Sequence, residues 1–195
     1  MSLEKNFDTT KLVGLIKSDL YRYEGRVSKI SFIRAYFRRP GFKFSFWMRI
    51  CGTAYKYKWA RHSILPLLDI IFDHYRYKFG FDIPYTLQIG PGLLIYHFGG
   101  IVFNPASCGK NVTISQNTTV GMRIYNGKKI YPIIKDNVYL APGAKIIGDV
   151  VVENNTAIGT NAVLTHSTHI NDVVVGIPAK VISTKGAAEY INYPI

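Results

Sequence analysis

Residues 134–174 read IKDNVYLAPGAKIIGDVVVENNTAIGTNAVLTHSTHINDVV, and this stretch repeats every six residues. Its small and aliphatic residues form two columns with the same step: Ile134, Leu140, Ile146, Val152, Ile158, Leu164 and Ile170, and, four residues after each, Val138, Ala144, Val150, Thr156, Ala162, Thr168 and Val174. Turn formers such as Asn154-Asn155 lie between the columns. A period of six fits neither an α-helix nor a sheet of hairpins, and it is typical of a parallel β-helix. We therefore predict short strands that each bury one side chain in a stacked core.

The step of six extends upstream, although less regularly. Ladder positions there are Ile83, Ile89, Ile95, Ile101, then Cys108 after a seven-residue step, Ile114 and Val120. Residues 122–132 are longer than one repeat and hold polar turn residues, so they predict a loop that projects from the β-helix. The ladder ends in the Gly176-Ile-Pro-Ala-Lys-Val-Ile182 segment. We assign residues 81–183 to the β-helix, and residues 184–195 form a tail too short for another domain.

The chain before the ladder is basic and rich in aromatic residues. Residues 1–80 hold 16 of the 24 Lys and Arg residues but only 6 of the 12 Asp and Glu residues, a balance of +10. The apolar spacing and the prolines predict helices near 12–20, 31–39, 42–60 and 66–77, the first capped by Thr9-Thr10 and the second ending at Pro40-Gly41. We therefore predict that residues 1–80 form a small helical domain.

Three interpretations of this basic domain remain open. Its Trp and Phe residues, interleaved with Lys and Arg between 22 and 61, favour the surface of an anionic membrane. The alternatives are a solvated basic face over an aromatic core and a nucleic-acid surface, and no recognised RNA- or DNA-binding module is visible. We expect no nucleic acid as partner.

The cysteines and the hydropathy pattern point to the cytoplasm. Cys108 occupies a ladder position and Cys51 lies among apolar residues, so neither indicates a metal site or a disulfide. Met1–Thr10 holds no apolar run typical of a signal peptide, and no stretch of about 18 apolar residues predicts a membrane span. We expect a cytoplasmic protein that associates peripherally with the membrane.

His97 is the histidine with the most suggestive surroundings. It is the third residue of the repeat that begins at Ile95, and Phe98-Gly99-Gly100 follows it, so the chain can pass close to a ligand there. An imidazole with an ordinary pKa near 6.5 suits a general base, and a plain surface role remains open on the residues alone. The other four histidines are expected to pack or to face solvent.

The ladder, His97 before its glycines and Gly176-Ile-Pro-Ala-Lys180 together resemble the hexapeptide-repeat acyltransferases. The nearest resemblance is to the serine acetyltransferase-like branch found in bacterial polysaccharide gene clusters. It covers Asp82 to Ser183, with a looser likeness in residues 18–23 and 40–49. The resemblance implies a mostly β fold, a left-handed parallel β-helix preceded by a small helical domain. It also implies acetyl-CoA as co-substrate, no metal, and a homotrimer whose sites lie between subunits.

The resemblance assigns roles to particular residues. His97 is the expected general base, and Asp82 is the acid expected to orient its ring. The expected coenzyme contacts are Gly121, Pro142, Thr160 and Lys180. The alternatives are structural: Asp82 as a turn residue where the ladder begins, and Gly176-Ile-Pro178 as a simple end to the β-helix.

Departures from the family pattern bear on the acceptor. Serine acetyltransferases have Asp-His where this chain has Tyr96-His97, and Arg-His-Pro where it has Ile130-Tyr131-Pro132. Because Ile130 cannot bind a carboxylate, serine is disfavoured, and Tyr96, Tyr125 and Tyr131 are expected to line a saccharide site. The predicted function is therefore O-acetylation of a sugar in a bacterial surface polysaccharide or its lipid-linked precursor. The alternatives are a serine O-acetyltransferase of cysteine biosynthesis and a non-catalytic, membrane-binding β-helix scaffold.

Overall fold

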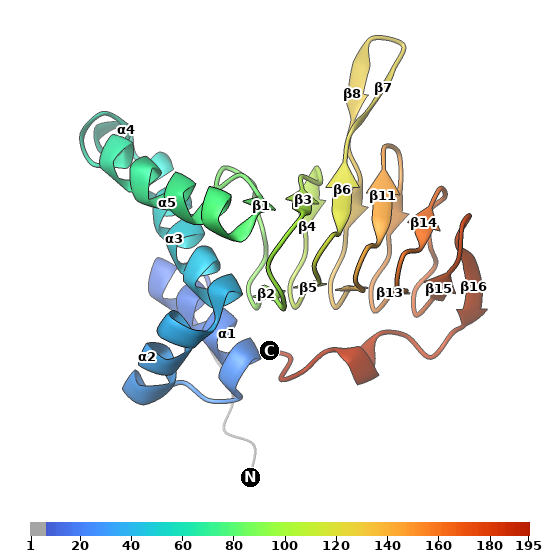
Figure 1. The fold of residues 1–195 in the computed structure, drawn as a ribbon, viewed down its shortest axis with the longest axis horizontal. Coiled ribbons are helices and arrows are strands. Elements are labelled where there is room, and N and C mark those ends of the chain that lie inside the picture. Colours follow the sequence, from blue (N-terminus) through green and yellow to red (C-terminus); the bar gives the residue numbers. More distant parts are fainter. Residues whose placement is uncertain (1–6) are drawn as a thin grey trace.

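The computed structural model describes residues 7–195, in which a helical part precedes a longer parallel β-helix, as predicted (Figure 1). Residues 1–6, where the predicted helical domain and the stretch tested for a signal peptide begin, lie outside the described residues. The helices are α1 (Leu12–Glu24), α2 (Lys29–Arg38), α3 (Pro40–Tyr55), α4 (Lys58–Ser63) and α5 (Leu65–Phe79). Within residues 7–195 no helix is both long and apolar enough to cross a membrane.

Glycine and proline set several helix boundaries. Gly25 and Gly80 each have a φ of 65° and end α1 and α5 in the left-handed conformation that glycine adopts without strain. Pro40 was expected to stop a helix, and it also begins α3, because its ring presets φ and the first turn needs no N–H. The helix predicted over 42–60 is instead two helices, α3 and α4, separated at residues 56–57.

Three sheets of short strands run along the β-helix. The first sheet holds β1 (Phe81–Asp82), β3 (Ile101–Phe103), β6 (Thr119–Gly121), β11 (Lys145–Ile147) and β14 (Val163–Leu164). The second holds β2 (Leu94–Ile95), β5 (Thr113–Ile114), β10 (Tyr139–Leu140), β13 (Ala157–Ile158), β15 (Val173–Val175) and β16 (Lys180–Ser183), and the third holds β4 (Ser107–Cys108), β9 (Ile133–Ile134) and β12 (Val151–Val152). The pairs are parallel except β15 with β16. Ile134 pairs with Val152, so one coil takes three six-residue repeats.

The ladder side chains fill the interior of the β-helix. Ile95, Ile114, Leu140 and Ile158 are fully buried along the second sheet, and the aliphatic residues of the other sheets meet them in one continuous core. Cys108 is 7% exposed and joins this core, and burial raises the pKa of its thiol to about 12. The predicted ladder is confirmed at these positions.

Ile170 is one of two ladder positions that the sequence assigns wrongly; at the other, Phe103 rather than Ile101 pairs with Val120. The Ile170 side chain is 59% exposed, although it stands six residues after Leu164. Ile158 pairs with Val174, sixteen residues on, whereas Leu140 pairs with Ile158, eighteen residues on. The last coil is therefore two residues shorter, and Thr168 takes the interior position there with its N–H bonded to Val151 O.

The segment 122–132, predicted as a projecting loop, is a β-hairpin. Its strands β7 (Arg123–Tyr125) and β8 (Lys128–Ile130) pair antiparallel and extend away from the body of the β-helix (Figure 1). Asn126 and Gly127 join them with φ values of 48° and 71°. An Asn-Gly pair with two positive φ angles is the favoured two-residue hairpin turn.

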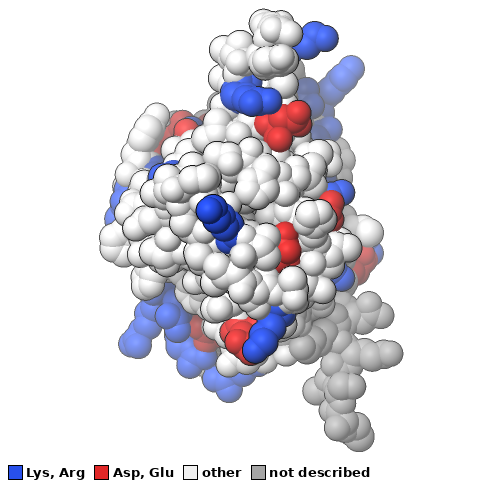
Figure 2. Space-filling model, turned by 90° about the vertical axis from the view of Figure 1, so that its right-hand side faces the viewer, with Lys and Arg blue, Asp and Glu red and all other residues white. Residues whose placement is uncertain are grey.

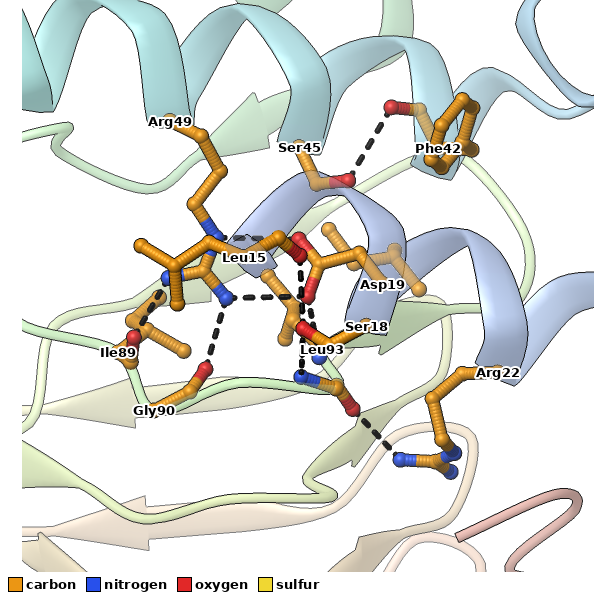
Figure 3. A network of polar contacts seen from close by, with 12 residues as sticks. Leu15, Ser18, Asp19, Arg22, Phe42, Ser45, Arg49, Ile89, Gly90 and Leu93 are labelled. Carbon is orange, nitrogen blue, oxygen red and sulfur yellow. Dashed lines mark hydrogen bonds and ion pairs between the residues drawn. The ribbon is translucent and has the colours of Figure 1, made fainter. Parts of the chain in front are cut away.

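Buried charges attach the helical domain to the first coils (Figure 3). The Arg49 guanidinium donates to both carboxylate oxygens of Asp19, at 3.0 and 3.1 Å, and to the carbonyls of Ile89 and Gly90. Asp19 also accepts a hydrogen bond from the N–H of Leu93 at 2.8 Å. Residues of α1 and α3 thereby bond to backbone groups that the sheets leave unpaired, which fixes the helices against the start of the β-helix.

Arg22 forms a second attachment, through two main-chain carbonyls and a threonine hydroxyl. Its three nitrogens donate to Gly92 O at 2.6 Å, Thr113 Oγ1 at 2.7 Å and Asn192 O at 2.8 Å. Burial lowers the pKa of Arg22 to about 10. One side chain thus joins α1, the β-helix and the C-terminal tail.

The C-terminal tail, residues 184–195, folds back along the molecule toward α1 (Figure 1). Ala187 N donates to the main chain of Asn155, and Ile195 N donates to Asn111 Oδ1. The 3₁₀ helix η1 (Ala188–Tyr190) lies between these anchors.

Candidate functional site

His97 stands at the corner between β2 and β3. Its side chain is exposed, and among residues 7–195 it makes no hydrogen bond, so both ring nitrogens are open to a ligand. The next two glycines have φ values of 107° (Gly99) and 63° (Gly100). A Cβ on Gly100 would lie 2.5 Å from Asn117 Oδ1, so the turn that presents His97 requires glycine there.

A cleft of about 350 Å³ opens beside His97. Residues of successive β-helix coils and of the C-terminal tail line it: Tyr96, His97, Ser115, Tyr139, Pro142, Glu189, Tyr190 and Asn192. Its size and its mixture of rings, hydroxyls and an amide suit a small polar ligand.

Two predicted coenzyme residues lie along the corner that carries His97. We call this corner the His97 edge; it comprises residues 96–99, 115–117, 141–143 and 159–161. The coils stack there through hydrogen bonds from Asn117 N to Gly99 O, Gly143 N to Gln116 O and Asn161 N to Pro142 O. Because neighbouring strands are about 4.8 Å apart, Pro142 lies roughly 10 Å and Thr160 roughly 15 Å from His97 along the edge.

Lys180 follows at the far end of the same line. It pairs with Val175 at the start of β16, directly after the turn at residues 176–179, and its side chain is exposed. An elongated ligand that starts at His97 and follows the edge would therefore meet the Lys180 ammonium at its other end.

Asp82 is not joined to His97 in this chain. The two residues line different pockets, and the Asp82 carboxylate accepts a hydrogen bond from Arg76 Nη2 at 2.7 Å. Burial alone would lower the pKa of Arg76, but its bonds to Asp82 and Asp73 outweigh that effect and raise it. Arg76, on α5, is therefore the hydrogen-bond partner of the carboxylate that the sequence assigned to orienting His97.

The remaining predicted residues lie at a different corner. Gly121 ends β6, where its carbonyl accepts from Gly148 N, and Tyr125 and Tyr131 belong to the hairpin segment that follows. Tyr125 is exposed near the tip of the hairpin. One chain therefore brings Tyr96, His97, Pro142 and Thr160 to one corner and leaves Gly121 and these two tyrosines at the next.

Sequence reasoning missed the contribution of the tail to the cleft. Glu189, Tyr190 and Asn192 line it, although residues 184–195 were considered only as a short end. The apolar Ala187 and Ile191 were the available signal that this end packs on the protein.

Comparison with known proteins agrees with this fold. The family model described as Bacterial transferase hexapeptide (six repeats) matches residues 131–166. Serine acetyltransferase of Staphylococcus epidermidis is 38% identical over 112 residues, which are 57% of this chain and 53% of that protein. The Staphylococcus aureus serine acetyltransferase is 37% identical over the same shares. Over these stretches the chain is similar to hexapeptide-repeat transferases and to serine acetyltransferases. It spans about half the length of these relatives.

Solved serine acetyltransferases share the architecture. The soybean apoenzyme has a TM-score of 0.74 at 25% identity, covering 89% of this chain and 70% of that one. The Brucella abortus enzyme, solved in complex with coenzyme A, has a TM-score of 0.74 at 24% identity and covers 89% and 68%. The predicted fold class and the predicted family resemblance are thereby confirmed.

Proposed function

We propose that this protein is an acetyl-CoA-dependent O-acetyltransferase with His97 as its general base. The observation that carries the proposal is an exposed, unbonded His97 beside a cleft, at one end of an edge that leads past Pro142 and Thr160 to Lys180. The relatives named serine acetyltransferase support the same reaction class, and coenzyme A is bound in one of the similar structures.

The reaction needs one base and a bound thioester. His97 takes the proton from the acceptor hydroxyl as its oxygen bonds to the acetyl carbon. The carbon–sulfur bond then breaks, and the proton held by His97 passes to the leaving thiolate. The coenzyme lies along the His97 edge, where Lys180 meets a phosphate as a point charge. Pro142 contributes no N–H donor there, so that position supplies contact only.

Two acceptors are in question, and serine comes first because the relatives are named for it. A saccharide hydroxyl is the second candidate, and one specific observation favours it. Ile130 is half-buried at the end of the hairpin, and by the family resemblance it takes the place of the arginine that holds the amino acid in serine acetyltransferases. The cleft also offers the rings of Tyr96, Tyr139 and Tyr190, which suit the face of a sugar.

The proposed active form is a homotrimer with shared sites. Three predicted residues lie one corner away from His97: Gly121, Tyr125 and Tyr131. They meet His97 only if a second copy places the corner that carries its hairpin against the His97 edge. Exposed Ile124 and Ile147 near that corner would be covered in the same contact. Sedimentation that gives a fully active monomer at micromolar concentration would refute both the trimer and the shared site.

The helical domain is proposed to contact an anionic membrane surface through α2. Ile30, Ile33 and Phe37 are 73%, 57% and 72% exposed on this helix, whose sequence also carries three basic residues. Lys and Arg side chains gather on the lower left of Figure 2, at the height of α1 and α2 in Figure 1. Vesicles with phosphatidylglycerol should bind the protein at low salt, and an Ile33→Asp/Phe37→Asp variant should not bind. Equal recovery with neutral vesicles would favour the solvated face instead.

The enzymatic proposal is tested by thiol release from acetyl-CoA with L-serine and with saccharide acceptors, followed by mass spectrometry of the products. Acetylated serine or sugar supports the proposal and names the acceptor. Release of thiol no faster than without protein, with every acceptor, would instead favour the non-catalytic scaffold.

A further inference from the structure

The C-terminal tail is held firmly against the β-helix. Ala187 and Ile191 are buried against Ala157 and Val173, and the ring of Tyr190 stacks on that of Tyr139 with centroids 5.1 Å apart. Asn155 holds the start of the tail, while Arg22 and Asn111 hold its end. These contacts hold the backbone between 187 and 195, so Glu189, Tyr190 and Asn192 are kept at the His97 cleft.

Glu189 gives the His97 cleft its charge. It is the one carboxylate among the described residues that line the cleft, and no Lys or Arg lines it. A phosphate or carboxylate group is therefore repelled from this end. A carboxylate favours hydrogen-bond donors instead, either hydroxyl groups or an ammonium group.

Asn192 acts on the residue next to His97. Its Nδ2 donates to the Tyr96 hydroxyl at 2.7 Å, so the Tyr96 oxygen accepts there and its own proton is left to donate into the cleft. The main chain of Asn192 is fixed separately, because its carbonyl accepts from Arg22 Nε at 2.8 Å. Asn192 is thus a positioning residue for Tyr96.

We propose that the C-terminal tail forms the acceptor-binding wall of the His97 cleft, with the Glu189 carboxylate accepting hydrogen bonds from the acceptor. This inference rests on the proposed O-acetyltransferase function and specifies its acceptor as a small molecule that presents hydroxyl or ammonium donors. The hydrogen bond from Arg22 Nε to the Asn192 carbonyl connects this wall to α1, so the helical domain also helps to hold the wall in place.

The test compares Glu189→Ala and Glu189→Gln with Glu153→Ala, which removes a carboxylate that does not line the cleft. Glu189→Ala should raise the acceptor KM about tenfold or more and leave the acetyl-CoA KM within about twofold, since a hydrogen bond to a charged group is lost on the acceptor side only. Glu153→Ala should change neither. If the acceptor presents an ammonium group, Glu189→Gln should be as impaired as Glu189→Ala, whereas a hydroxyl acceptor should leave Glu189→Gln clearly better.

The role of Asn192 is tested through Tyr96. Asn192→Ala should lower turnover in the wild-type background and have little further effect in a Tyr96→Phe background, because the two residues act through one hydrogen bond. Active enzyme in which Glu189→Ala and Asn192→Ala leave acceptor KM and turnover unchanged would overturn this inference and leave the proposed function standing. Wild-type protein that acetylates no acceptor would overturn both.

Discussion

Asp19→Asn tests what holds the helical domain on the β-helix. The Asp19 side chain is 1% exposed and the Arg49 side chain 6%, and their atoms lie 3.0 Å apart. Removing the carboxylate charge leaves a buried guanidinium without its partner, which costs about 3–5 kcal/mol. At roughly 2–4 °C per kcal/mol for a chain of this size, the Tm should fall by about 6–20 °C. Thermal unfolding followed by circular dichroism measures it.

Asp8→Asn is the matched control, because Asp8 pairs with Lys11 at 2.9 Å on the surface, where the two side chains are 53% and 78% exposed. Water and salt screen that pair, so its loss should leave the Tm unchanged. A double variant, Asp19→Leu with Arg49→Met, should recover part of the lost stability by removing both charges together. An Asp19→Asn protein with the Tm of the Asp8→Asn protein would refute the attachment described above.

Three further predictions concern the core, the thiols and the coenzyme. Ile158→Ala should destabilise the protein by about 2–5 kcal/mol in urea unfolding, whereas Ile170→Ala should have almost no effect; equal losses would contradict the shortened last coil. Burial raises the pKa of the Cys51 and Cys108 thiols to about 12, so both should resist a thiol reagent at pH 8 until the protein unfolds. Rapid labelling of the native protein would count against their burial. Lys180→Ala should raise the KM for acetyl-CoA with a smaller effect on turnover, and an unchanged KM would remove Lys180 from the coenzyme site.

The β-helix was predictable because the residues that fill its interior recur at a fixed spacing along the sequence. Each buried residue is placed by neighbours six positions away, so Ile134 to Leu164 could be assigned without any long-range contact. Ile170 keeps the six-residue spacing but lies outside the core. The last coil is two residues shorter than the others, although the apolar pattern of the sequence continues unchanged through it. Only the pairing of Ile158 with Val174 reveals the shift.

The candidate site was predictable only in part, since its remaining contacts join distant segments. His97 was found from its glycines and the family resemblance, and the structure places it at an open cleft. The partner of Asp82 is Arg76, whose role no repeat or motif indicates. Asn192 meets Tyr96 across 96 positions of sequence, and such a contact leaves no periodic pattern.

Several sequence-based expectations remain predictions. They are the roles of Asp82, Gly121, Pro142 and Thr160, the three tyrosines as acceptor contacts, the cytoplasmic location and the absence of nucleic-acid binding. Replacement of Arg76 would inform on the role of Asp82, because the Arg76 guanidinium lies 2.7 Å from the Asp82 carboxylate in this chain.

The most direct measurement is turnover of His97→Ala at saturating acetyl-CoA and acceptor, with thiol release and acetylated product followed separately. As general base, His97 supplies about 10²–10⁴-fold of the rate, so turnover should fall by that factor while the affinity for coenzyme A stays nearly unchanged. His97→Ala that retains wild-type turnover would contradict the account, and the likeness to serine acetyltransferases would then be one of fold alone.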